Sequence, residues 1–196
     1  MAHQDLEKLF SLALENETDE KVREGILAVK NGSDTVSLPD DLTRAEKEGE
    51  EKPLTEEREK SLYSAIKELP VPEKIKLAIF GNRFARQLLI RDSNRQVALF
   101  VLENPRLTDG EIIEFSNNTN LDDLIFRVIT NNSNWTKYYA VKLAFVSNPK
   151  VPIDVSIRWV NYLQDRDLRR LAKSKNIPEV IAGQCRKLLD KRRTKE

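Results

Sequence analysis

The hydrophobic pattern of the chain predicts a protein built from short amphipathic helices. Apolar residues recur every three or four positions in residues 4–15 and again in residues 19–30, where the turn formers Asn31-Gly32 should end the second helix. A third pattern of this kind starts near Thr55 and stops at Pro70-Val71-Pro72, since proline cannot continue a helix. The chain up to Pro72 therefore predicts three helices and the connections between them.

From residue 73 onward the chain repeats one phrase, an apolar helical run that reaches an asparagine. The phrase occurs as LAIFGN (77–82), LFVLEN (99–104), FRVITN (126–131), LAFVSN (143–148) and LAKSKN (171–176), and the third step from one asparagine to the next is clearly the shortest. Asparagine tolerates the left-handed conformation that often ends a helix, and a proline just beyond it makes the stop complete. We therefore expect Asn104 and Asn148 to have φ > 0.

Signals for the start of a new helix follow these stops. Thr108 and Glu111 have the spacing of a capping box, and Asn120 suits an N-cap. Pro152 and Pro178 suit the first helical position, where a missing N–H costs nothing. The short step between Asn131 and Asn148 predicts that the third unit has lost its second helix and kept the segment NSNW (132–135) as a connector. The expected helices cover residues 73–81, 83–91, 94–103, 108–117, 121–130, 137–147, 152–163, 166–175 and 178–190.

The repeated phrase also carries a resemblance to a known family. The Asn-Pro turns after LFVLEN and LAFVSN, with KIKLAIFGNRFARQLLIRDSNRQVALFVLENPRLT and DRDLRRLAKSKNIP, resemble bacterial leucine-rich-repeat-variant proteins, which are α-solenoids related in style to HEAT repeats. The resemblance covers about residues 73–190 and implies an all-α fold with a right-handed α-solenoid of about five short repeats. Some relatives hold a cysteine-ligated iron–sulfur cluster, for which the single Cys185 supplies too few ligands.

The same pattern predicts the organisation of the chain. We expect short amphipathic helices in residues 1–30, an acidic and partly disordered linker in 31–53, a connecting helix in 54–72, the solenoid in 73–191 and a basic tail in 192–196. A polar N-terminus, a single cysteine and the lack of a long apolar run predict a cytoplasmic protein without membrane insertion.

Charge is divided unevenly along this plan. The net charge of +1 combines −8 in residues 1–60 with +9 in residues 61–196. This division indicates either an anionic partner for the second part or a contact between the two parts. We expect residues 1–30 to be able to contact the solenoid, with Leu6, Leu9 and Phe10 as an apolar anchor, and to regulate access to it.

Residues that could carry catalysis or hold a cofactor are scarce. His3 is the single histidine and lies near the chain end, and Cys185 lies on an apolar helix face, where a free cysteine is usually a small buried hydrophobe. The glycines are too isolated to form a phosphate-binding loop, and paired carboxylates lie at helix starts, where they complement the helix dipole. We therefore expect a non-enzymatic protein with no cofactor and no metal site.

Two sets of residues are candidate recognition surfaces. Three cations follow the repeat asparagines by one or two positions and would form a ladder along a solenoid edge, and aromatic residues gather at the shortened third unit. A solvated basic face and aromatic core filling are the structural alternatives. The candidate partner-binding residues are Arg83, Arg86, Arg106, Lys150, Trp135, Tyr138, Arg169 and Arg170.

The function expected from these features is protein binding. A solenoid presents a long surface without needing a catalytic pocket, so we expect an adaptor or scaffold with a protein partner, and an acidic partner would suit the basic ladder. The alternative is a HEAT-like nucleic-acid-binding protein that uses the basic face of residues 83–175. A pI near 7.8 is low for a nucleic-acid-binding domain, which makes the alternative the weaker of the two.

Overall fold

The computed structural model describes residues 2–32, 40–43 and 56–194, and within these ranges the chain forms α-helices and no strand. The described chain divides into two compact units, Met1–Leu107 and Thr108–Glu196. The all-α class expected from the hydrophobic pattern is confirmed. Every helix that the pattern predicts is present, and two further short helices, α3 and α10, lie in segments where we expected a linker or a connector. None of the described helices combines the length and the apolar character needed to cross a bilayer.

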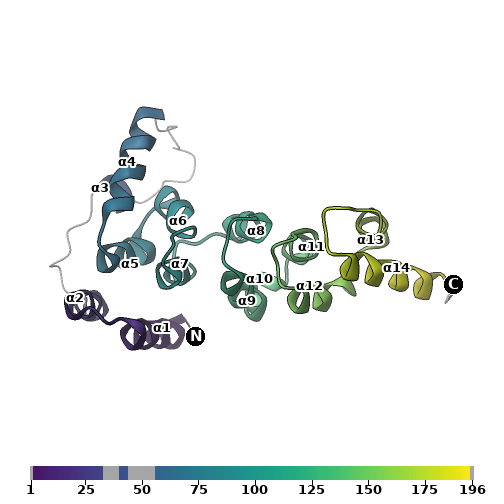
Figure 1. The fold of residues 1–196 in the computed structure, drawn as a ribbon, viewed down its shortest axis with the longest axis horizontal. Helices are drawn as coiled ribbons and strands as arrows, with labels where there is room; N and C mark the ends of the chain where they lie inside the picture. Colours follow the sequence, from purple (N-terminus) through teal and green to yellow (C-terminus); the bar gives the residue numbers. More distant parts are fainter. Residues whose placement is uncertain (1, 33–39, 44–55, 195–196) are drawn as a thin grey trace. The chain divides into compact units, whose positions relative to one another are not determined.

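The first unit is built on two neighbouring helices, α5 (Val71–Phe80) and α7 (Arg95–Val101), joined through α6 (Arg83–Leu89). The N-terminal helices α1 (Ala2–Asn16) and α2 (Glu20–Lys30) pack against α7 and α5 respectively (Figure 1). Phe10 is buried on α1 with its ring centroid 4.8 Å from that of Phe100 on α7, and Ile26 of α2 is fully buried. Helices α1 and α2 therefore contact α7 and α5 through buried apolar side chains.

The first unit also includes part of the segment in which we expected a linker. Residues Asp40–Thr43 form α3, whose Leu42 is fully buried and accepts a hydrogen bond of 2.7 Å at its backbone oxygen from the Asn82 N–H. Asn31 and Gly32 form the turn after α2, and residues 33–39 and 44–53 of that expected linker lie outside the described residues. Helix α4 (Glu56–Glu68) follows, with Leu62 and Ile66 buried and Tyr63 exposed.

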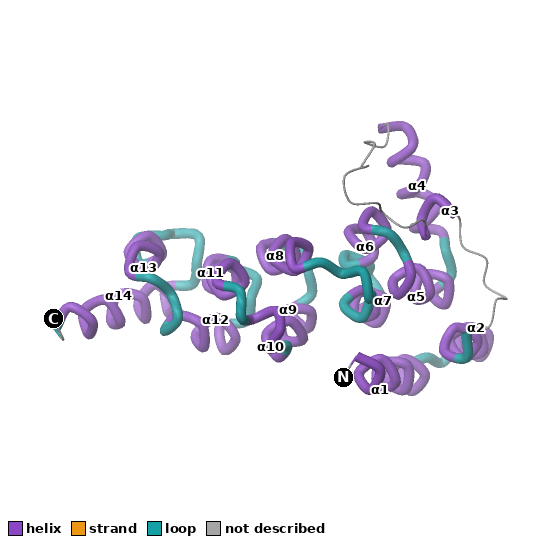
Figure 2. The backbone as a smooth tube through the Cα atoms, turned by 180° about the vertical axis from the view of Figure 1, so that it is seen from behind, coloured by secondary structure: helices purple, strands orange, loops and turns teal. Residues whose placement is uncertain are grey.

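The second unit consists of three helix pairs in two layers (Figures 1 and 2). One layer holds α8 (Asp109–Asn117), α11 (Tyr139–Ser147) and α13 (Asp165–Leu171), and the other holds α9 (Asp123–Asn131), α12 (Ile153–Val160) and α14 (Glu179–Arg193). Helix α8 packs on α11, and α12 packs on both α11 and α14. The core between the layers includes the edge-to-face pair Phe126 and Phe145, whose ring centroids are 6.5 Å apart.

The asparagines of the repeated phrase do not adopt the expected left-handed conformation. No described residue other than glycine has φ > 0, and Asn148 has φ −86° and ψ 117°. Instead, the Asn148 side chain is buried, and its Nδ2 donates to the backbone oxygens of Ser116 and Asn118 at 3.0 and 2.9 Å. These oxygens lie at the end of α8, the helix against which α11 packs. The prediction of φ > 0 was wrong because the asparagine caps the neighbouring helix through its side chain.

Asn104 makes the same contact in the first unit. Its buried Nδ2 donates to the backbone oxygens of Ala78 and Gly81 at the end of α5, at 2.8 and 3.1 Å. The last carbonyls of a helix have no partner within the helix, so an amide from the adjacent helix satisfies two of them at once. One sequence phrase therefore appears twice because the same contact between neighbouring helices occurs twice.

Four turns share one local hydrogen bond, and their positions differ from those of the asparagines in the sequence phrase. In four turns a polar side chain accepts a hydrogen bond from the backbone N–H of the residue two positions later. The next residue along the chain is apolar, and the one after it is the N-cap of a helix. The accepting side chains are Asn104, Asn118, Asn148 and Ser174, at 2.9, 2.8, 3.0 and 3.2 Å. Ser174 occupies the position that we expected for Asn176, and Asn131 lies at the end of α9 in the other layer. The spacing of the accepting residues is irregular as well, since Asn104 and Asn118 flank the single helix α8.

The helix starts agree with the sequence to within two residues. Both hydrogen bonds of the Thr108–Glu111 capping box are present, as predicted. The N-cap of α9 is Asp122 rather than Asn120, and Pro152 and Pro178 are N-caps rather than first helical residues. The expected connector NSNW largely coincides with a helix, α10 (Ser133–Thr136), which Asn132 caps.

Candidate functional site

One of the basic residues that we expected to bind a partner, Arg86, is not on the surface. Arg86 is only 1% exposed, and its Nη1 donates to the Gly81 backbone oxygen at 3.0 Å. It shares the buried stripe of α6 with Ala85 and Leu89, so the prediction that Arg86 binds a partner was wrong. The guanidinium instead helps to cap the end of α5, where buried carbonyls need a donor.

The other cations of this set are exposed. Arg83 begins α6, and Arg106 follows Asn104 and donates from Nη1 to the Thr43 backbone oxygen at 2.9 Å. Lys150 follows Asn148 in the second unit. Each is available to solvent within its own unit, and a common ladder through both units stays a prediction.

Helix α13 carries a second cationic surface. Arg169 and Arg170 are exposed, and Arg170 forms an ion pair with Asp167 at 3.3 Å. Further exposed cations stand before and after them. The exposed basic residues of this segment are Arg166, Arg169, Arg170, Lys173 and Lys175.

The aromatic residues near α10 are half-buried, between the two alternatives that the sequence left open. Trp135 lies on α10. The Tyr138 hydroxyl donates to the Asp109 carboxylate, and the Lys137 ammonium lies 4.8 Å from the Tyr138 ring centroid. Tyr138 therefore joins the start of α11 to α8 and leaves part of its ring in solvent.

Trp159 and Tyr162 lie three residues apart and share a face near the end of α12. Their ring centroids are 5.5 Å apart, and the Trp159 Nε1 donates to the Thr130 hydroxyl at 2.8 Å. The Lys142 ammonium lies 5.9 and 5.3 Å from the two ring centroids. Since Trp159 is fixed by α9 and Lys142 by α11, this cluster mainly holds the second unit together.

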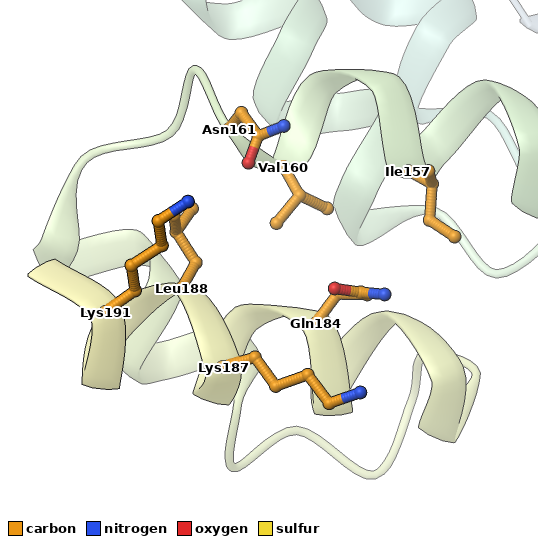
Figure 3. A pocket seen from close by; sticks show the side chains of 7 residues that line it. All are labelled: Ile157, Val160, Asn161, Gln184, Lys187, Leu188 and Lys191. Atoms are coloured by element: carbon orange, nitrogen blue, oxygen red, sulfur yellow. The ribbon is translucent and has the colours of Figure 1, made fainter.

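A groove between α12 and α14 is the surface that the sequence analysis missed. It has a volume of about 250 Å³, and Figure 3 shows how side chains of the two helices face each other across it. Its lining residues are Ile157, Val160, Asn161, Gln184, Lys187, Leu188 and Lys191. In Figure 3 the residue numbers rise in the same direction along both walls, so α12 and α14 run parallel past the groove.

Exposed apolar side chains extend the groove toward the starts of both helices. Ile157 is 37% exposed, Ile153 lies one turn before it on α12 and is 43% exposed, and Val180 lies one turn before Gln184 on α14 and is 53% exposed. Together with Leu188, these residues make an apolar strip along two adjacent helices. We call the lining residues with Ile153 and Val180 the α12/α14 groove.

The charges of the α12/α14 groove are positive. Lys187 and Lys191 are exposed on the α14 wall and stand one helical turn apart. The acidic residue of α12, Asp154, is held by Arg127 of α9 in a two-point contact of 2.7 and 3.2 Å. The hydrogen bond from Arg127 lowers the pKa of Asp154, which is therefore a paired carboxylate.

The sequence held a signal for this surface. Val155 and Val160 of α12 are buried, while Ile153 and Ile157, spaced by four, form a second apolar stripe on the same helix. Two stripes on one short helix indicate two contacts, and the packing of the described helices covers one of them. The identity of the facing helix, α14, could not be derived from periodicity.

The remaining chemistry is sparse in the part of the chain that the structure describes. Cys185 is fully buried, and burial raises the pKa of its thiol, which keeps the unreactive protonated form. No group of three or more His, Cys, Asp or Glu residues in the described ranges could hold a metal ion.

Comparison of the chain with family models, with curated proteins and with solved structures found no match to any of them.

Proposed function

We propose that this chain is a helical-repeat module that binds another protein, as an adaptor or scaffold, and that the α12/α14 groove is its partner site. The observation that carries the proposal is the apolar strip of Ile153, Ile157 and Val180, exposed along two adjacent helices. Apolar strips with a polar rim are typical of surfaces that bury against a partner. The cations beside the strip favour a partner with acidic side chains.

The repeat character of the proposal is supported by the turns. Asn104, Asn118, Asn148 and Ser174 accept the same hydrogen bond within their turns, and the same amide contact joins neighbouring helices in both units. These recurring contacts support a repeat architecture, which we propose is a right-handed α-solenoid of the leucine-rich-repeat-variant type with about five short repeats. In such an architecture the exposed faces of successive helices form a continuous binding surface.

Autoregulation by removal of the N-terminal helices fits the packing poorly. Phe10 and Ile26 are buried in the core of the first unit, so truncation of residues 1–30 would expose apolar surface as well as any covered site. We therefore propose constitutive binding through the second unit.

A photocrosslinking experiment tests the proposed function. A benzophenone amino acid replaces Gln184 in the groove or, as a control, the exposed Asn117 of α8. A protein that is captured through position 184 and not through 117 is then identified and purified, and its affinity is measured by calorimetry. Ile157→Asp should weaken binding at least about tenfold, because a carboxylate would be buried against an apolar floor.

The matched control for Ile157→Asp is Leu27→Asp on α2, a change of similar size at a similarly exposed apolar residue in the first unit. Equal affinities for the wild type, Ile157→Asp and Leu27→Asp proteins would show that the groove is not the partner site. A partner captured equally well through both crosslinking positions would lead to the same conclusion.

The cationic surface of α13 favours a second candidate function, the binding of nucleic acid. Five exposed basic residues lie between residues 166 and 175, where phosphates could approach them. This function predicts that affinity for an oligonucleotide falls steeply with salt and is lost in Arg166→Glu/Arg169→Glu, while Ile157→Asp has no effect.

A further inference from the structure

We propose that the occupant of the α12/α14 groove is an acidic amphipathic α-helix of a partner protein, laid along the groove with its apolar face down. This inference rests on the proposed function and specifies the chemistry of its partner. Three features of the groove argue for it: the spacing of the apolar residues, the positive charge of the lining and the exposed apolar strip.

The spacing of the apolar residues fits a short helix. Ile153 and Ile157 follow each other at one helical turn on one wall, and Val180 and Gln184 do so on the other. From Ile153 to Asn161 the wall is about 12 Å long, at about 1.5 Å per residue, which corresponds to about two turns of a helix lying beside it. A partner helix with apolar residues at positions i, i+4 and i+7 would place one on each turn of this strip.

The position of the lysines selects the charge of that helix. Lys187 and Lys191 are the two charged residues of the lining, and both belong to α14. In Figure 3 the Lys191 side chain lies at the Asn161 end of the groove, and the Lys187 side chain extends toward Gln184. Acidic side chains on the flank of the partner helix that faces α14 could reach both ammonium groups. Helix α14 as a whole carries five basic and two acidic residues, so its field also attracts an anionic partner.

The acidic residues around the groove do not cancel this charge. Asp154 is paired with Arg127, and Glu179 is paired with Arg186. Asp190 stands on α14 outside the lining of the groove. The lining itself holds two cations and no anion, which gives the groove a defined sign.

The apolar strip of the groove favours an amphipathic helix over nucleic acid as the ligand. Nucleic acid would contact the lysines through its phosphates and leave the strip in water, whereas an amphipathic helix covers the strip and meets the lysines together. The strip is short, so we expect a dissociation constant on the order of 10 μM for one helix at moderate salt.

The test uses the full chain and three fluorescent peptides of about 16 residues, a length at which designed helices are stable enough to study. The first has leucine at i, i+4 and i+7 and glutamate on the flanks, the second replaces each glutamate by lysine, and the third has the composition of the first in scrambled order. We expect the first peptide to bind at least about tenfold more tightly than the other two. A thymidine oligonucleotide serves as the polyanion without an apolar face.

Charge reversal in the protein provides the decisive comparison. Lys187→Glu/Lys191→Glu should lower the affinity for the acidic peptide at least about tenfold and raise the affinity for the basic peptide. Lys187→Gln/Lys191→Gln removes the positive charges without reversing them, so it should lower the affinity for the acidic peptide and leave that for the basic peptide unchanged. Lys173→Glu/Lys175→Glu, which changes two exposed lysines outside the groove, is the control and should have no effect. Thermal unfolding followed by circular dichroism shows whether each variant is folded.

Each outcome decides the inference. Equal binding of the acidic and scrambled peptides, tighter binding of the oligonucleotide that responds to the same lysines, or no effect of reversal would overturn it. If a partner identified by crosslinking at position 184 requires Ile157 but is indifferent to Lys187 and Lys191, the proposed function stands and the acidic helix is wrong. If that partner is also indifferent to Ile157, both are wrong.

Discussion

Replacement of Asn148 by alanine should destabilise the second unit substantially, although the residue lies in a turn. The Asn148 Nδ2 donates two hydrogen bonds, to the Ser116 and Asn118 backbone oxygens, and its Oδ1 accepts one from the Lys150 N–H. Alanine removes all three. The sequence phrase alone would assign Asn148 a purely local role in ending α11.

The size of the effect follows from the burial of each partner. The contact with Ser116 is fully buried, so its oxygen loses a partner that water does not replace, at a cost of about 1–3 kcal/mol. The other two contacts are partly buried and contribute about 0.5–1.5 kcal/mol each. Since such contributions are not fully additive, we expect a loss of about 2–4 kcal/mol, which lowers Tm by roughly 4–16 °C in a chain of this size.

Denaturant unfolding followed by circular dichroism measures this loss. Asn117→Ala on α8 is the matched control, because Asn117 is exposed and donates to Ile113 of its own helix. Its effect should stay within about 0.5 kcal/mol. A similar small effect at Asn148 would refute the account of the interhelical contact.

Glycine and aspartate variants separate the competing explanations. A left-handed residue would be rescued by Asn148→Gly, whereas at the observed φ of −86° glycine should be at least as destabilising as alanine. Asn148→Asp keeps an oxygen that can accept from the Lys150 N–H, but it places a carboxylate oxygen against the Ser116 and Asn118 carbonyl oxygens. Burial beside these oxygens would raise the folded pKa of that carboxyl. The variant should therefore be least impaired below the unfolded pKa of about 3.9 and lose stability as pH rises above it.

Three further predictions concern buried side chains. Phe10→Ala should destabilise the first unit by about 3–5 kcal/mol in denaturant unfolding, while Leu12→Ala on the exposed side of α1 should have little effect; equal effects would place α1 outside the core. Arg86→Ala should lower the free energy of unfolding by about 2–4 kcal/mol, whereas Arg91→Ala, at an exposed position, should lower it by less than about 0.5 kcal/mol. The reverse order would mean that Arg86 is a surface residue. Cys185 should react with a maleimide far more slowly in the native protein than in denaturant, because its thiol is buried and its pKa is raised; equal rates would contradict its burial.

Most of the helices could be predicted from the sequence, because their signals are local. Apolar spacing and capping residues such as Thr108 and Glu111 act within a few residues of the chain. The role of Asn148 could not be predicted in this way, since its partners Ser116 and Asn118 belong to the end of a different helix, far back along the chain. The repeated asparagine is therefore recognisable in the sequence, but its contact with the neighbouring helix is seen only in the structure.

The candidate site was harder to predict for the same reason. Arg86 looked like a surface cation, and its place among Ala85 and Leu89 on one stripe was the available sign of burial. Ile157 was not singled out in the sequence, and its partial exposure depends on how α14 packs beside α12. Burial depends on which helix covers which face, and a periodic pattern does not specify the covering helix.

Chemical-shift mapping of the acidic amphipathic peptide on the ¹⁵N-labelled full chain is the most direct test of whether the α12/α14 groove is the partner site. The groove account predicts that the largest shifts of backbone amides fall on Ile153, Ile157, Gln184 and Leu188, with saturation at the same peptide concentration for all four. Shifts that centre instead on α13, or that spread over the second unit without saturating, would contradict a partner site between α12 and α14.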